Sequence, residues 1–234
     1  MERVTVSSAR YLRVVTFQVH GPESAVDAVL RDRVIPRLLA ESPVVDVWQG
    51  RRGAADRNRV LASTWTNAVG TSASPNDRPA ADIASLRSDD VEALGGVEIG
   101  SLDELPLAVH ARFVRPDVAR VLRVFRGHVR PGELDAYIDE AREGMTADAA
   151  ANAGLVSFAL GRRDPDDFIT VSTWTDWGSI EAATGGNTRQ PIATRNASRL
   201  AHFRVDHLEL LPEAPVTRAD DGPGHHDPTL EAAT

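Results

Sequence analysis

Apolar and polar residues alternate in several short stretches of the chain, a pattern that predicts β-strands. Between these stretches, apolar residues recur at every third or fourth position, which is typical of helices. Pro36 lies inside the first of these helical stretches and predicts a kink or an early end there. The predicted strands are 11–20, 44–52, 59–67, 121–129, 155–163, 168–175 and 202–211, and the predicted helices are 23–40, 80–95, 132–150 and 176–200.

Three short segments recur at nearly the same offset, which indicates an internal duplication. STWTN at 63–67 returns as STWTD at 172–176, an offset of 109 residues; GRR at 50–52 returns at 161–163, an offset of 111; and VVTF at 14–17 corresponds to VFRG at 124–127, an offset of 110. Because this period is too long for a solenoid, we predict two copies of one ordinary-sized domain, 1–116 and 117–212. Residues 213–234 are rich in Pro, Gly, Asp and Ala without periodicity, and we expect a disordered tail.

Each copy has the predicted order β-α-β-β-α-β, the split βαβ arrangement of ferredoxin-like folds. The last strand of the first copy has two candidates, 97–102 and 107–113, of which we favour the second. Such a unit has one sheet with helices on one face, so its other face must be covered by something else. Two copies solve this by packing sheet to sheet around a shared interior. The predicted class is therefore α+β, with two tandem units forming one barrel.

Composition excludes several classes of protein. The formal net charge of −8 and the pI of about 5.4 argue against nucleic acid as a partner. The chain has no cysteine, so disulfides and thiolate metal sites are excluded, and no metal-ligand spacing is found. No apolar stretch is long enough to span a membrane, and the first residues lack a secretory pattern, so we expect a cytoplasmic protein.

Several segments resemble the antibiotic biosynthesis monooxygenase (ABM) superfamily of dimeric α+β barrels. The resemblance covers about residues 11–211 and is better for the second copy. It rests on the β-α-β-β-α-β order, the STWT strand end, the segment Ala183-Thr184-Gly185-Gly186 followed by Arg189, Pro191 and Thr194, and the final Val205-Asp206-His207. Members of this superfamily differ in function, so the resemblance implies one of several classes: cofactor-independent oxygenases of anthrones and quinols, reduced-flavin-dependent oxygenases, heme-degrading enzymes, and domains with no known reaction.

Strand alternation then predicts which side chains face the barrel interior. Apolar Val15, Phe17 and Val19 should pack on helices, which turns Thr16, Gln18 and His20 inward. The same reasoning predicts further inward residues: Asp46, Trp48, Ser63, Trp65 and Asn67 in the first copy, and Arg126, His128, Ser157, Ala159, Ser172, Trp174 and Asp176 in the second. This mixture of aromatic and polar groups is typical of a small-molecule site.

The leading hypothesis is a monooxygenase that oxidises an electron-rich aromatic or quinol with O2. His20 or His128 would act as the base, Asn67 would hold the phenolate oxygen, and Gln18, Trp48, Trp65, Trp174 and Arg126 would bind the substrate. We expect no metal and no obligatory cofactor, with reduced flavin or heme as the alternatives, and we leave a homodimer open. The rival functions are a non-catalytic ligand-binding or scaffold protein and a heme-binding or heme-degrading protein. A single working pocket is expected in the first copy, because Asp176 stands in the second copy where the first has Asn67.

Overall fold

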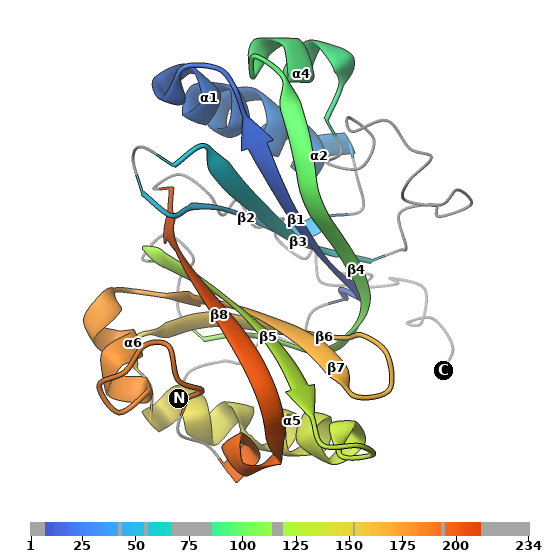
Figure 1. Ribbon diagram of the computed structural model, residues 1–234, viewed down its shortest axis with the longest axis vertical. Helices are drawn as coiled ribbons and strands as arrows, with labels where there is room; N and C mark the ends of the chain where they lie inside the picture. Colours follow the sequence, from blue (N-terminus) through green and yellow to red (C-terminus); the bar gives the residue numbers. More distant parts are fainter. Residues whose placement is uncertain are drawn as a thin grey trace, which may run out of the picture.

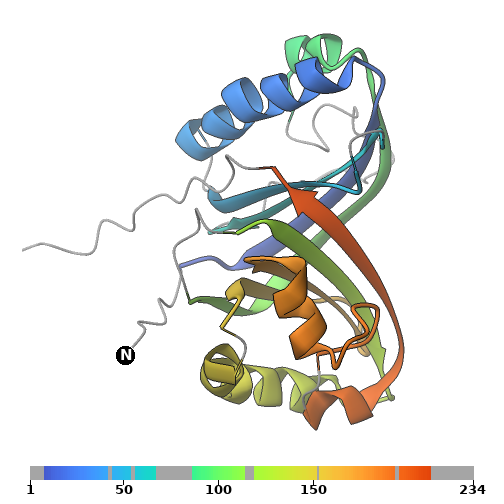
Figure 2. The same ribbon diagram turned by 90° about the vertical axis from the view of Figure 1, so that its left-hand side faces the viewer.

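Two β-sheets with helices on their outer faces make up the protein (Figure 1). The computed structural model describes residues 8–41, 44–53, 56–66, 86–113, 119–151, 153–192 and 195–211. Turning the molecule shows the same four layers, with helices at both ends of the long axis and the strands between them (Figure 2). The predicted tail 213–234 lies outside the described residues, and the proposed domain boundaries stay a prediction.

The first half has the predicted order of elements. Its strands are β1 (Tyr11–Val19), β2 (Val44–Arg51), β3 (Asn58–Trp65) and β4 (Val97–Arg112), and its helices are α1 (Glu23–Val29), α2 (Ile35–Glu41) and α4 (Ser88–Ala93). The kink expected at Pro36 takes the form of a wider π-helical turn, Leu30–Val34, that joins α1 to α2. Proline lacks the N–H that an α-helical turn requires, so a local change of helical winding lets the helix continue past it.

The second half repeats this order more regularly. Its strands are β5 (Val121–Val129), β6 (Leu155–Arg162), β7 (Asp167–Trp174) and β8 (Leu200–Leu210), and its helices are α5 (Leu134–Ala151) and α6 (Trp177–Ala183), followed by a 3₁₀ turn, Arg195–Arg199. The two segments between β7 and β8 correspond to the interrupted helix predicted there. No helix among the described residues is both long and apolar enough to cross a membrane.

The eight strands close into one antiparallel barrel with the order β1-β3-β2-β8-β5-β7-β6-β4. Both competing segments for the fourth strand belong to a single long strand, so the choice of 107–113 alone was wrong. The part of β4 from Val97 to Pro106 pairs with β1 in its own half, and the part from Leu107 to Arg112 pairs with β6 of the other half. At the opposite seam β8 extends from β5 to β2. The predicted arrangement of two sheets around a shared interior is confirmed.

The barrel interior is a packed apolar core. It contains Leu12, Val14, Trp48, Val60, Ala62, Leu105, Leu122, Val124, Ala159, Ile169, Val171 and Leu208, among others. Two further cores lie between each sheet and its own helices. The molecule therefore has three apolar layers, and any small-molecule site has to lie at an edge of one of them.

Candidate functional site

Only part of the predicted inward-facing set faces inward. Trp48 and Ala159 lie in the barrel core, and Thr16 and Arg126 line a cavity on the same inner face. Val15, Phe17 and Val19 pack on the helices of the first half as predicted. The alternation of β1, β2 and β5 was therefore assigned to the correct faces.

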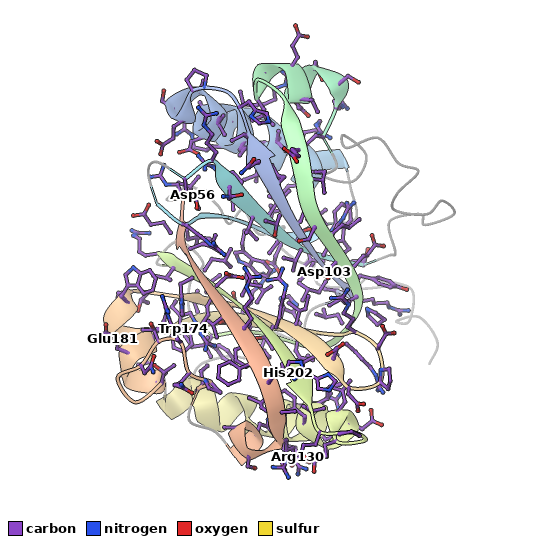
Figure 3. All side chains as sticks on the ribbon, viewed as in Figure 1. Asp56, Asp103, Arg130, Trp174, Glu181 and His202 are labelled. Atoms are coloured by element: carbon purple, nitrogen blue, oxygen red, sulfur yellow. The ribbon has the colours of Figure 1, made fainter. Side chains whose placement is uncertain are left out.

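The orientation predicted for Trp65 and Trp174 was wrong. Each lies in the core between its sheet and the helices, and Trp174 is placed beside α6 in Figure 3. The indole N–H of Trp65 donates to Ser63 Oγ over 2.8 Å, and that of Trp174 donates to Ser172 Oγ over 2.9 Å. Because residues two apart share a face of a strand, the repeated S-T-W is a self-contained packing unit. The pattern of apolar and polar residues gave the wrong face for these tryptophans, because β3 and β7 carry apolar residues on both faces.

The other predicted site residues are not brought together. Gln18 and His20 are exposed at the end of β1, and Asn67 lies outside the described residues. His128 Nδ1 lies 2.7 Å from Asp167 Oδ1, and the His128 ring stacks on His202 with centroids 4.4 Å apart. Asp176 caps the N-terminus of α6, where its side chain accepts a hydrogen bond from the Ser179 backbone N–H. The residues that the sequence analysis proposed as catalytic base, hydrogen-bond donor and aromatic walls therefore do not form one site in the described part of the chain.

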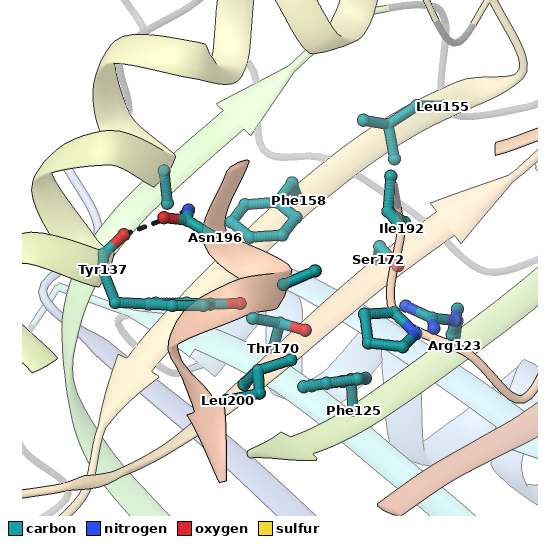
Figure 4. A pocket seen from close by; sticks show the side chains of 13 residues that line it. Arg123, Phe125, Tyr137, Leu155, Phe158, Thr170, Ser172, Ile192, Asn196 and Leu200 are labelled. Carbon is teal, nitrogen blue, oxygen red and sulfur yellow. Dashed lines mark hydrogen bonds between the residues drawn. The ribbon is translucent and has the colours of Figure 1, made fainter. Parts of the chain in front are cut away.

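The structure instead shows a pocket between the second sheet and its helices (Figure 4). Its cavity volume is about 60 Å³, within about 640 Å³ of space between atoms that includes open solvent. Strands β5, β6 and β7 supply the floor, α5 supplies one wall, and the segment after α6 supplies the other. The lining residues are Arg123, Phe125, Tyr137, Ala141, Leu155, Phe158, Thr170, Ser172, Pro191, Ile192, Asn196, Ala197 and Leu200. Apolar walls with a few convergent polar groups are the usual make-up of a ligand site.

Arg123 is the dominant charge in this pocket. Its side chain is only 3% exposed, and among the described residues it forms no ion pair with a carboxylate. One guanidinium N–H donates to the Gln190 carbonyl over 2.7 Å, the guanidinium carbon lies 5.3 Å from the centre of the Phe125 ring, and Nε has no hydrogen-bond partner among the described residues. Burial lowers the pKa of Arg123 to about 10, an effect that Tyr137 partly offsets. A buried cation without an anion is costly, and a bound anionic ligand would relieve that cost.

The duplication shows why this arginine has no counter-charge. Arg13 occupies the equivalent position on β1, and there Glu104 stands directly opposite on β4, with Nε of Arg13 3.9 Å from the carboxylate. In the second half the residue directly opposite Arg123, on β8, is His207. Burial and the neighbouring Arg123 lower the pKa of His207 to about 4, against the opposing effect of Asp206, so this imidazole is neutral at pH 7. The first half thus neutralises its buried arginine, and the second half does not.

Two other polar groups of the pocket are available to a ligand. Burial raises the pKa of Tyr137, which keeps its hydroxyl neutral, and that ring reaches toward Thr170 in Figure 4. Asn196 donates to the Tyr137 carbonyl over 3.3 Å, while its buried Oδ1 has no partner in the described part of the chain. The pocket thus offers a cation, a hydroxyl and an amide oxygen within apolar walls, a combination suited to an aromatic ligand that carries a negative charge.

Sequence reasoning missed this site, although one signal for it was present. The segment LRVV at 12–15 returns as LRVF at 122–125, so the repeat includes the buried arginine of each half. An arginine in the middle of an apolar strand, on the face that packs against helices, is unusual enough to mark a site. The exchange of Glu104 for His207 becomes visible only when the register of β4 and β8 is known.

Comparison with known proteins gives likenesses of structure alone. No protein-family model matches the chain, and no curated protein matches its sequence. A provisionally assigned monooxygenase from Lactobacillus acidophilus superposes with a TM-score of 0.60 and 13% identity, over 89% of this chain and 96% of that one. Another, from Fusobacterium nucleatum, gives 0.61 and 11%, over 87% and 93%. An anthrone oxidase-like protein gives 0.51 and 12%, over 89% and 94%.

These likenesses extend over nearly the whole length of both partners, so they include the two halves and the way in which the halves join. At identities of 11–13% they show the fold alone. The chemistry of the pocket has to be argued from the residues that line it in this chain. The chain has the tandem α+β barrel fold of these monooxygenase-like proteins.

Proposed function

We propose that the chain is a monooxygenase that oxidises an electron-rich aromatic substrate, such as a hydroquinone or an anthrone, bound as its anion in the pocket of the second half. The observation that carries the proposal is the buried Arg123, which has no carboxylate partner among the described residues. The fold shared with monooxygenase-like proteins and the apolar walls of the pocket support it.

Arg123 would activate the substrate for the reaction. A cation in a site of low dielectric stabilises the phenolate or enolate form of a bound substrate and so lowers the substrate's pKa. The anion carries electron density on a ring carbon, which reacts with O2 to form a hydroperoxide. Loss of water then leaves a carbonyl group, so that a CH2 group and one O2 become C=O and H2O. In this scheme all four electrons that reduce O2 come from the substrate, and Tyr137 would donate a hydrogen bond to the substrate oxygen.

Oxygen uptake tests the proposal. With 1,8-dihydroxyanthrone or 1,4-dihydroxynaphthalene, we expect the protein to raise the rate of O2 consumption above the spontaneous rate, with one O2 consumed per anthrone. The Arg123→Gln variant should lose most of this increase, because the substrate anion is no longer stabilised. Catalysis that is unchanged in the variant would contradict the role given to Arg123. Binding of the aromatic anion without any oxygen uptake would favour the ligand-binding function over the enzyme.

A further inference from the structure

A second cavity lies on the inner face of the barrel, on the other side of the sheet from Arg123. Its cavity volume is about 790 Å³, and β1, β3, β4, β5 and β8 contribute to its lining. Val60, Val124 and Leu208 are the buried, apolar part of its lining. Its rim is charged, which distinguishes it from the apolar core below it.

Four arginines share two aspartates at this rim. Arg163 and Arg126 contact Asp103 at 3.2 and 3.4 Å. Asp206 is contacted by Arg204 at 3.3 Å, by Arg126 at 3.4 Å, and by Arg52. Among the residues that line the cavity, the positive charges therefore exceed the negative ones by two. This local excess occurs in a chain whose formal net charge is −8.

The arrangement costs free energy in the absence of an anion. Arg126 on β5 stands directly opposite Arg204 on β8, and like charges in such a cross-strand pair repel each other. Arg126 also reaches both aspartates only at 3.4 Å, which is longer than an ordinary charged hydrogen bond. A guanidinium held this loosely can turn toward a ligand with little loss. Figure 3 shows Asp103 at the junction between the two halves.

The duplication produces most of this rim. Arg52 and Arg163 are the last residues of the repeated GRR, and Asp103 and Asp206 lie on the last strand of each half. Arg126 stands where the first half has Thr16, and Arg204 stands where it has Ser101, so both are charges that the second half adds to the cavity lining. Arginine binds phosphate oxygens in a bidentate manner, and a cleft with an excess of one sign of charge concentrates ions of the opposite sign.

We infer that this rim binds a phosphate monoester as its dianion, with Arg126 and Arg204 as the principal ligands. Two negative charges match the excess of two at the rim, and the apolar depth below it accommodates the organic part of the ester. The inference is independent of the proposed oxygenase, because Arg126 and Arg123 project from opposite faces of β5.

Calorimetric titration with phenyl phosphate at 0.15 M NaCl tests the inference, since this salt concentration screens weak surface attraction. We expect saturable binding, weaker binding of inorganic phosphate, and still weaker binding of phenyl sulfate, which carries one charge. Arg126→Gln and Arg204→Gln should each reduce the affinity about tenfold or more. Both variants should fold, because Asp103 and Asp206 keep other arginine partners.

Arg142→Gln is the matched control, because Arg142 is an exposed arginine on α5 whose ionic partner is Asp139. It should bind phenyl phosphate as the unaltered protein does. Binding of 2-naphthoate, which reports on the Arg123 pocket, should stay unchanged in Arg126→Gln. Absence of saturable phenyl phosphate binding, or equal affinity in all variants, would overturn the inference. Equal affinity for inorganic phosphate and phenyl phosphate would show that the rim binds the free ion. That result would overturn the inference that the ligand is a phosphate monoester.

Discussion

Replacing Arg123 by methionine is expected to weaken binding of 2-naphthoate about 10- to 100-fold, because the ligand loses a charge-assisted hydrogen bond in a buried site. Binding of 2-naphthamide, which has nearly the same shape without the charge, should change much less. Methionine fills a similar volume and needs no counter-ion, so the free energy of unfolding should be unchanged or higher. The measurements are calorimetric titration and urea unfolding.

Arg13→Met is the control for this experiment. Arg13 is as buried as Arg123, but its carboxylate partner Glu104 would be left behind without it. This variant should lose stability and keep its affinity for 2-naphthoate. Equal loss of affinity in both variants would mean that the ligand does not occupy the pocket of the second half.

Alanine at Gly50 and at Gly161 is expected to destabilise the barrel by about 1–3 kcal/mol each, and the double variant by about twice as much. Each glycine lies where a strand of one half meets a strand of the other. A Cβ at Gly50 would lie 2.7 Å from Leu208 Cβ and 2.9 Å from Leu122 Cδ2, and one at Gly161 would lie 2.8 Å from Leu105 Cβ. Overpacking at the two seams would therefore push the two sheets apart.

Urea unfolding of the two variants measures this effect, and Gly53→Ala is the matched control because a Cβ there meets nothing within 4 Å. A double variant as stable as the unaltered protein would show that the seams have room for both added methyl groups. The close contacts at the two seams also account for the second repeated segment. In both halves the glycine of GRR leaves room for the barrel to close, and its last arginine lies at the barrel rim.

The fold could be predicted because the duplication preserves the residues that shape it. The STWT and GRR repeats mark a packing unit and a seam in each half, and both occur at the same place in the two sheets. The length of β4 could not be predicted, because its pairing changes from β1 to β6 just after Pro106, and a proline within a candidate strand argues against one continuous strand. Strand continuity across a seam depends on the partner strand rather than on local propensity.

The site could be predicted only in part. The prediction placed the pocket on the inner face of the barrel, where Thr16 and Arg126 line a cavity but Trp48 and Ala159 lie in the apolar core. In the pocket on the outer face, the missing counter-charge of Arg123 is explained by His207, which stands at the register position that Glu104 has in the first half. The prediction that the first half holds the working pocket compared Asn67 with Asp176, whereas the electrostatic difference between the described halves lies opposite the two buried arginines.

The most direct test of this account is calorimetric titration of 2-naphthoate at pH 7 into two variants of one residue, His207→Glu and His207→Gln. Glutamate gives the second half the arrangement of Arg13 and Glu104, so an ionised carboxylate would neutralise Arg123. Glutamine has a similar size and no charge. The account predicts that the glutamate variant loses binding about tenfold or more, while the glutamine variant keeps it. Equal affinity of the two variants for 2-naphthoate would contradict the claim that an unneutralised Arg123 makes this pocket a site for aromatic anions.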